Sequence, residues 1–192
     1  MSWIWALFQS PYKTYSDYAL WQAMLFGEVF AFEEIYDRYA DKIYMYSYHI
    51  TWNKKEAEDV VSMSMLKLYE YLQKNSWTNL KGLIYRIAHN EIINQFKWNR
   101  YVVWEDNHMV SVQDNDSMID EVEHIYIRSY LEQGLNLLEP KAKEILYLLY
   151  YEELSYHEIA DIMSSSTNTV WVRVMRAKKQ LKSKLWIESF TF

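Results

Sequence analysis

Cysteine is absent from this sequence, and helix breakers are scarce, with three glycines and two prolines in 192 residues. Without cysteine the chain has no disulfide bonds or thiolate metal sites, which is consistent with a reducing compartment. The scarcity of glycine and proline, together with few alternating apolar and polar runs, predicts an all-α protein. A hydrophobic content of 51% over this length is ample for one large or two small packed domains.

Long apolar runs are also missing. The opening stretch, MSWIWALFQS, holds an apolar run of only about six residues, far below the length that spans a bilayer. No basic residue precedes this run, which argues against a signal peptide. We therefore expect a soluble, cytoplasmic protein without membrane insertion.

The sequence has few signals of catalysis. It has no glycine-rich phosphate loop and no serine-nucleophile elbow. The five histidines lack metal-ligand spacing: His49, His89, His108, His124 and His157. We expect no enzymatic activity, no metal or other cofactor, and no small-molecule substrate.

Charge is unevenly distributed along the chain. The net charge of −6 argues against a protein that coats nucleic acid non-specifically. Residues 101–124 contain seven acids and no Lys or Arg, whereas residues 166–185 contain six bases and no acid. The acidic stretch is rich in Asp, Asn and Ser, so it predicts a flexible linker between two small helical domains. The predicted division is an N-terminal extension (1–17), a helical domain (18–100), the linker (101–124) and a second helical domain (125–192).

Apolar periodicity predicts the helices of the first domain. Asn53 with Glu56 three residues later forms a variant of the capping box, which marks a helix start. The helix that follows has an apolar stripe at helical spacing: Ala57, Val60, Val61, Met65, Leu68 and Leu72. A further helix over residues 80–100 combines packing residues with a basic face.

The second domain contains a candidate helix-turn-helix in LSYHEIADIMSSSTNTVWVRVMRAKKQL, residues 154–181. Ser155 and Glu158 form a capping box, and Ser166 suits the N-cap of the second helix. Small polar side chains and free N–H groups at that N-terminus can reach base edges and phosphates. Arg173 and Arg176 further along can neutralise the DNA backbone. From this segment alone, a solvated basic helix in an ordinary bundle remains the alternative.

A longer comparison of motifs favours the DNA-binding interpretation. The stretch LLEPKAKEILYLLYYEELSYHEIADIMSSSTNTVWVRVMRAKKQL resembles region 4 of the extracytoplasmic-function (ECF) sigma factors of bacterial RNA polymerase. Independently, AFEEIYDRYADKIY, AEDVV and LKGLIYRIAHNEIINQF resemble region 2 of that family, in the same order and spacing. Two matching blocks joined by an acidic linker are far more specific than a helix-turn-helix alone.

The resemblance implies a transcription initiation factor with core RNA polymerase, promoter DNA and an anti-sigma factor as partners. Residues expected to bind polymerase are Glu58, Asp59, Val61 and Met63. Residues expected to bind the melted −10 element are Arg86, His89, Asn90, Asn94, Lys97 and Arg100. Residues expected to bind the −35 element are Ser166, Thr167, Asn168, Thr169, Trp171, Arg173, Arg176 and Lys179.

Several residues depart from the family pattern and add apolar surface or remove positive charge. They are Ser62, Met63, Leu83, Trp98, Ser164 and Trp171. Because of these departures two alternatives stay open. One is a helix-turn-helix regulator that does not engage polymerase, and the other is a helical interaction protein with the same fold that does not bind DNA.

Overall fold

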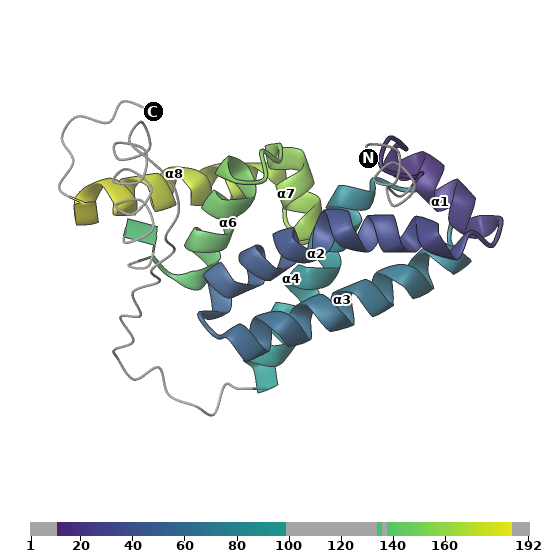
Figure 1. Cartoon of the computed structure of the whole chain (residues 1–192). Helices are drawn as coiled ribbons and strands as arrows, with labels where there is room; N and C mark the ends of the chain where they lie inside the picture. The colour runs from purple at the N-terminus through teal and green to yellow at the C-terminus, as the bar shows by residue number, and fades with distance from the viewer. Residues whose placement is uncertain (1–10, 99–133, 136–137, 186–192) are drawn as a thin grey trace, which may run out of the picture. The chain divides into compact units, whose positions relative to one another are not determined.

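The computed structural model of the chain describes residues 11–98, 134, 135 and 138–185 (Figure 1). Over these residues all regular secondary structure is helical, which confirms the all-α prediction. The helices are α1 (Asp17–Leu25), α2 (Val29–Thr51), α3 (Lys54–Lys74), α4 (Leu80–Trp98), α6 (Pro140–Tyr150), α7 (Tyr156–Ile162) and α8 (Thr167–Leu185). No helix in these ranges is both long and apolar enough to cross a membrane.

The chain divides into two compact units with a boundary near residue 98. The first unit contains α1 to α4, and the second contains α6, α8 and most of α7. The predicted linker, residues 101–124, lies outside the described residues. The predicted domain limits therefore remain a prediction.

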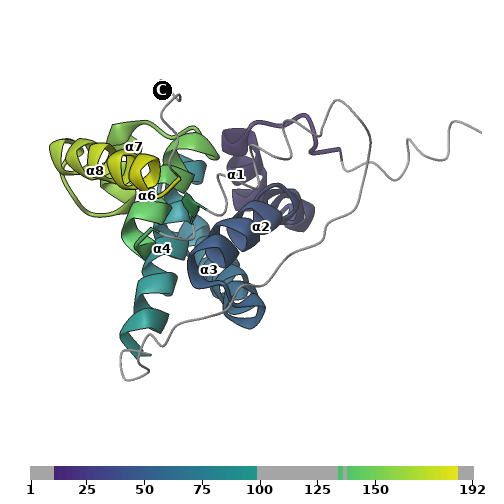
Figure 2. The same cartoon turned by 90° about the vertical axis from the view of Figure 1, so that its left-hand side faces the viewer.

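The first unit is built around α2 and α3, which lie side by side in both views (Figures 1 and 2). Their facing stripes are buried, and all six residues of the stripe predicted for α3 belong to the core. Asn53 caps α3, accepting from the backbone N–H groups of Lys55 (3.0 Å) and Glu56 (3.3 Å), which confirms the predicted helix start. From α4, Tyr85 packs edge-on against Tyr46 of α2, with ring centroids 5.3 Å apart.

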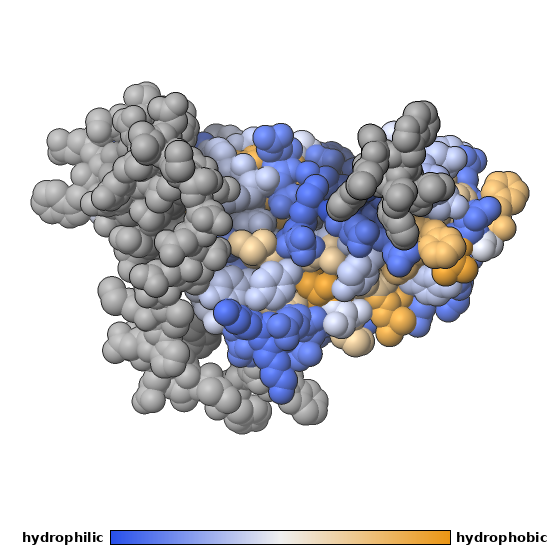
Figure 3. Space-filling view, in the orientation of Figure 1, coloured by the Kyte–Doolittle hydropathy of each residue, from blue (hydrophilic) through white to orange (hydrophobic). Residues whose placement is uncertain are grey.

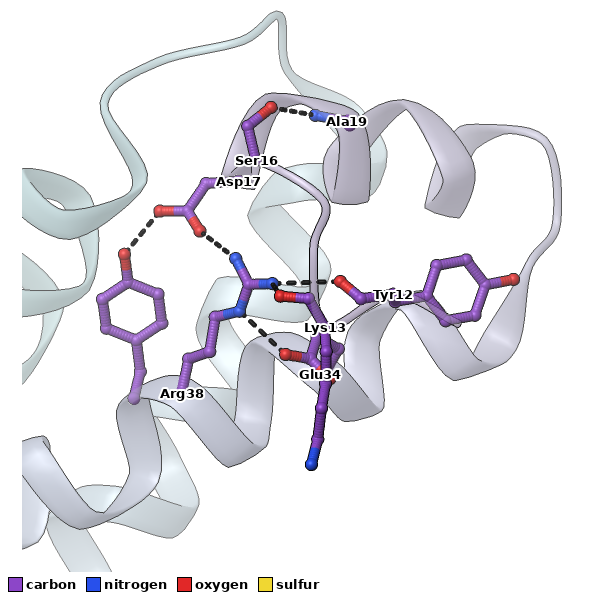
Figure 4. A network of polar contacts seen from close by, with 8 residues as sticks. Tyr12, Lys13, Ser16, Asp17, Ala19, Glu34 and Arg38 are labelled. Atoms are coloured by element: carbon purple, nitrogen blue, oxygen red, sulfur yellow. Dashed lines mark hydrogen bonds and ion pairs between the residues drawn. The ribbon is translucent and has the colours of Figure 1, made fainter. Parts of the chain in front are cut away.

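The segment before α1 is fixed to α2 by a polar network (Figure 4). Arg38 donates hydrogen bonds to the carboxylates of Glu34 (2.9 Å) and Asp17 (3.1 Å) and to the carbonyl oxygens of Tyr12 (3.0 Å) and Lys13 (3.1 Å). The second oxygen of Asp17 accepts from the Tyr39 hydroxyl at 2.5 Å. Ser16 caps α1, accepting from Ala19 N–H at 3.2 Å. Residues 12–17 are thus attached to the first helical unit, although they fall within the predicted N-terminal extension.

The helix starts of the second unit follow local sequence rules, and the capping box predicted at Ser155 is one of them. Pro140 occupies the first turn of α6, where its missing N–H costs no hydrogen bond. Ser155 and Glu158 form a reciprocal capping box before α7: Ser155 N–H donates to the Glu158 carboxylate (2.9 Å), and Glu158 N–H donates to Ser155 Oγ (3.3 Å). The apolar stripe of α8, with Val170, Val174 and Ala177, is buried.

The turn between α7 and α8 is made by Ser164, which has a left-handed backbone with φ 48°. Glycine is the usual residue for this conformation because it has no Cβ to clash with the backbone. Ser165 N–H closes the turn by donating to the Ala160 carbonyl at 2.9 Å. The serine therefore preserves the geometry that glycine would give, at some conformational cost.

Candidate nucleic-acid interface

The N-terminus of α8 presents short polar side chains and backbone donors. Ser166 caps the helix, with its Oγ accepting from Thr169 N–H at 3.2 Å and lying 2.7 Å from Thr169 Oγ1. Thr167 and Asn168 are exposed in the first turn. A helix N-terminus of this kind favours anionic groups such as phosphate. Because the Ser166 hydroxyl already serves the cap, Thr167 and Asn168 are the freer of the predicted contacts here.

Further along, α8 has two polar flanks rather than one. Residues two apart lie about 160° from each other around a helix. Thr169, Arg173 and Arg176, spaced by four and three residues, therefore share one flank, and Trp171 lies near the opposite one. Arg176 is exposed and Arg173 is half-buried.

The flank that carries Trp171 mixes aromatic, apolar and basic groups. Trp171 is 51% exposed, and Met175, one turn later, is 50% exposed. Lys178 lies beside them and also approaches the Tyr150 ring, 5.2 Å from its centroid. A helix in the major groove has one phosphate backbone on each side. The two flanks of α8 can therefore contact the backbones of the two DNA strands.

On α4 the predicted contacts form a partial stripe. Arg86, Asn90 and Asn94 are exposed and recur every four residues, so they share one face. His89 is only 6% exposed, one turn from Tyr85, whose ring packs inside the unit. A direct DNA contact by His89 would need this side chain to become accessible, and the assignment stays a prediction. The side chain of Lys97, and Arg100 altogether, lie outside the described residues.

On α3 the predicted polymerase contacts divide in the same way. Glu58 and Asp59 are exposed, and Met63 is 41% exposed. Val61 is 8% exposed because it belongs to the apolar stripe facing the core, so its predicted contact, which stays a prediction, has little accessible surface. Sequence reasoning missed Leu66 and Tyr69, which are 52% and 40% exposed. They continue the face of Asp59 and Met63 at helical spacing. This spacing of three to four residues is the sequence signal that could have identified them.

The comparisons with known proteins match both units. Residues 35–100 match the family described as Sigma-70 region 2, which contains most of α2 and all of α3 and α4. Residues 128–181 match Sigma-70, region 4, which contains α6, α7 and most of α8. Together the two matches cover more than half of the chain.

Two curated relatives and two solved structures agree with these matches. The chain is 26% identical to ECF RNA polymerase sigma factor SigW of Bacillus subtilis, over 83% of this chain and 91% of that one. It is 22% identical to ECF RNA polymerase sigma factor SigM of the same organism, over 79% and 93%. The fold is similar to CnrH (TM-score 0.65, 16% identity, covering 90% of this chain and 99% of that one). It is also similar to the sigma factor RpoE of Bartonella quintana (TM-score 0.67, 21% identity, covering 83% and 99%).

The two matched regions follow one another in the family's order, and each has its helices formed and a polar face exposed. The curated relatives are matched over nearly their whole length. The chain belongs to the ECF sigma factors of RNA polymerase.

Proposed function

We propose that this chain binds core RNA polymerase and directs it to specific promoters through −10 and −35 element recognition. The observation that carries the proposal is the presence, in one chain, of two sigma regions whose α4 and α8 each present an exposed polar face. The function needs no catalytic group in this chain, and it takes place where polymerase acts, in the cytoplasm.

Recognition of the −35 element is assigned to α8. Thr167 and Asn168 at its N-terminus are placed to contact phosphates and base edges. Arg173 and Arg176 supply bidentate donors for guanine or phosphate from one flank. Lys179 adds charge farther along the exposed side. Trp171 is assigned an apolar contact, for example with a thymine methyl group, because an indole neutralises no phosphate.

Recognition of the −10 element is assigned to the α4 stripe of Arg86, Asn90 and Asn94. Asparagine amides can pair with the edges of unstacked bases, and an arginine can bind the adjacent backbone or stack on a base. A melted strand exposes those edges, so a stripe of this composition suits single-stranded DNA. His89 and Val61 are 6% and 8% exposed, so the proposal gives them no leading role in the interfaces.

Polymerase binding is assigned to the exposed face of α3 formed by Asp59, Met63, Leu66 and Tyr69. An apolar centre with an acid at its edge is typical of the composition of protein interfaces. Met63→Glu should therefore weaken capture of core polymerase by placing a charge in the interface. Gln73→Glu is the matched control, because it makes the same charge change at an exposed position of the same helix.

The decisive experiment is run-off transcription with core polymerase and a promoter library from which the protein selects its own templates. The proposal predicts transcripts that depend on this chain and share two conserved elements upstream. Failure of core polymerase to co-purify with the chain would overturn it and leave a helix-turn-helix regulator that acts alone. Retained DNA selectivity after Arg173→Ala with Arg176→Ala would overturn the −35 assignment.

We further infer an anti-sigma partner. The solved relatives were captured in complexes: CnrH with the cytosolic domain of CnrY, and RpoE with the anti-sigma factor NepR. The exposed apolar groups on α3 of this chain offer a surface that such a partner could cover. A partner of this class should compete with core polymerase for the chain, and simultaneous binding of both without competition would contradict the inference.

A further inference from the structure

The turn between α1 and α2 carries four exposed apolar side chains. Leu25 is 51% exposed, Phe26 86%, Val29 80% and Phe30 65%. Within the turn, Gly27 follows Phe26, the C-cap of α1, and takes a left-handed backbone with φ 87°. Figure 3 shows apolar groups gathered at this end of the first unit, over the turn and the adjoining start of α2. We call these four residues the apolar turn.

Large contiguous apolar groups on a soluble protein mark a surface that something covers. The chain itself leads to this surface. The Tyr12 hydroxyl donates to Glu28 Oε2 at 3.0 Å, and Glu28 lies in the middle of the apolar turn. Arg38 holds the same segment by the carbonyl oxygens of Tyr12 and Lys13. The start of the described chain is therefore anchored beside the exposed patch.

The segment that precedes this anchor, residues 1–10, has the composition of an apolar ligand. It contains no charged side chain, and six of its residues are large and apolar: Met1, Trp3, Ile4, Trp5, Leu7 and Phe8. An extended chain advances about 3.3 Å per residue, so ten residues can reach up to about 33 Å from the anchor. Tethering raises its local concentration far above that of any free competitor.

We propose that residues 1–10, which lie outside the described residues, pack their Trp and Phe side chains against the apolar turn. The segment then acts as a covering strap for the first unit. Covering the Phe26 and Phe30 rings removes from water the largest exposed aromatic area near the anchor. The proposal is independent of the assigned promoter contacts, which lie on α4 and α8.

The absence of cysteine makes the test clean, because an introduced cysteine is the only thiol. In the full chain, Val29→Cys should react slowly with a neutral maleimide. Replacing Trp3, Trp5 and Phe8 together with Ser should raise that rate roughly tenfold, if the covered state is about ten times more populated than the open one. Lys55→Cys, exposed at the start of α3, is the matched control and should react at the same rate with either segment.

A second measurement identifies the occupant. In the variant with Phe8→Cys and Val29→Cys, oxidation should give a disulfide within one chain at every protein concentration. Disulfide-linked dimers, or protection of Val29→Cys that disappears on dilution, would assign a second copy and overturn the proposal. Protection that appears only with phosphatidylglycerol vesicles would assign a membrane surface and also overturn it. Equal Val29→Cys rates with the native and the serine segment would overturn it as well, and unchanged circular dichroism confirms that each variant is folded.

Discussion

Replacing Arg38 with Met should detach the segment before α1 and destabilise the first unit. Arg38 is the hub of the network in Figure 4, where it pairs with Glu34 of its own helix and with Asp17 of α1. Methionine keeps the apolar stem of the side chain, so packing changes little. What disappears is the charge and all four hydrogen bonds that the guanidinium donates.

The exposure of each partner sets the size of the effect. The Glu34 side chain is only 7% exposed, so removing its partner leaves a nearly buried carboxylate, which costs about 1–3 kcal/mol. Asp17 is 28% exposed and Arg38 25%, so water screens this pair and it contributes at most about 1 kcal/mol. Water can also reach the freed carbonyl groups. Arg38→Met should therefore lower the free energy of unfolding of the first unit by about 1–4 kcal/mol.

Hydrogen exchange by mass spectrometry measures this in the full chain, because peptides of α1 and α2 report the first unit separately from those of α8. Lys55→Met makes the same charge change at an exposed position and should stay within about 0.5 kcal/mol of the parent. Adding Glu34→Gln to Arg38→Met should recover about 1 kcal/mol, since the second change removes the unpaired buried charge. A destabilisation by Arg38→Met no larger than that by Lys55→Met would refute this reasoning.

Three other predictions concern residues between Pro140 and Leu185. Burial lowers the pKa of Lys143 to about 8 from its ordinary 10.5, so between these two pH values the unfolded chain holds more of this proton than the folded chain does. The contribution of Lys143 to stability should therefore rise with pH from about 8 to 10.5. In a series of urea melts, the difference in stability between the parent and Lys143→Met should change over this window in that direction. Ser164→Gly should raise the free energy of unfolding by up to about 1 kcal/mol in the same melts, because glycine adopts the left-handed backbone without strain. A lower free energy of unfolding would contradict the inference that Ser164 is strained. Promoter affinity measured at several salt concentrations separates two kinds of contact. Arg173→Ala with Arg176→Ala should make the slope of log affinity against log salt shallower by up to about 0.9 for each phosphate contact that is lost. Trp171→Ala should weaken binding without changing that slope.

Local rules are enough to predict the helices and several of their ends. The caps at Asn53, Ser155 and Ser166 depend on residues two to three positions away, so short-range pattern determines them. The fold class and the family follow from the same periodicity and from motif order. Each of these features rests on contacts within a helix or at its first turn.

Features that depend on packing between helices do not follow from such local rules. Arg38 meets Asp17 across 21 residues and Tyr12 across 26, and no periodic pattern joins such distant positions. Val61 belongs to the apolar stripe of α3, and only the packed structure shows how completely each residue of that stripe is buried. Leu66 and Tyr69 lie outside the predicted apolar stripe of α3, and their exposure in the packed structure is what makes them candidates for a partner contact.

The distribution of charge decides how an acidic protein can read DNA. At physiological salt a charge is screened beyond about 8 Å, so a phosphate in contact with α8 responds to the local bases of that helix and hardly to the net charge of −6. At longer range the acidic chain gains no electrostatic steering toward DNA, because its total charge has the same sign as the phosphates. Fast and tight promoter binding by the chain alone is therefore disfavoured, whereas a chain already held on polymerase needs only the short-range contacts of α4 and α8. The charge pattern thus favours an order of assembly in which polymerase is bound first and promoter DNA second.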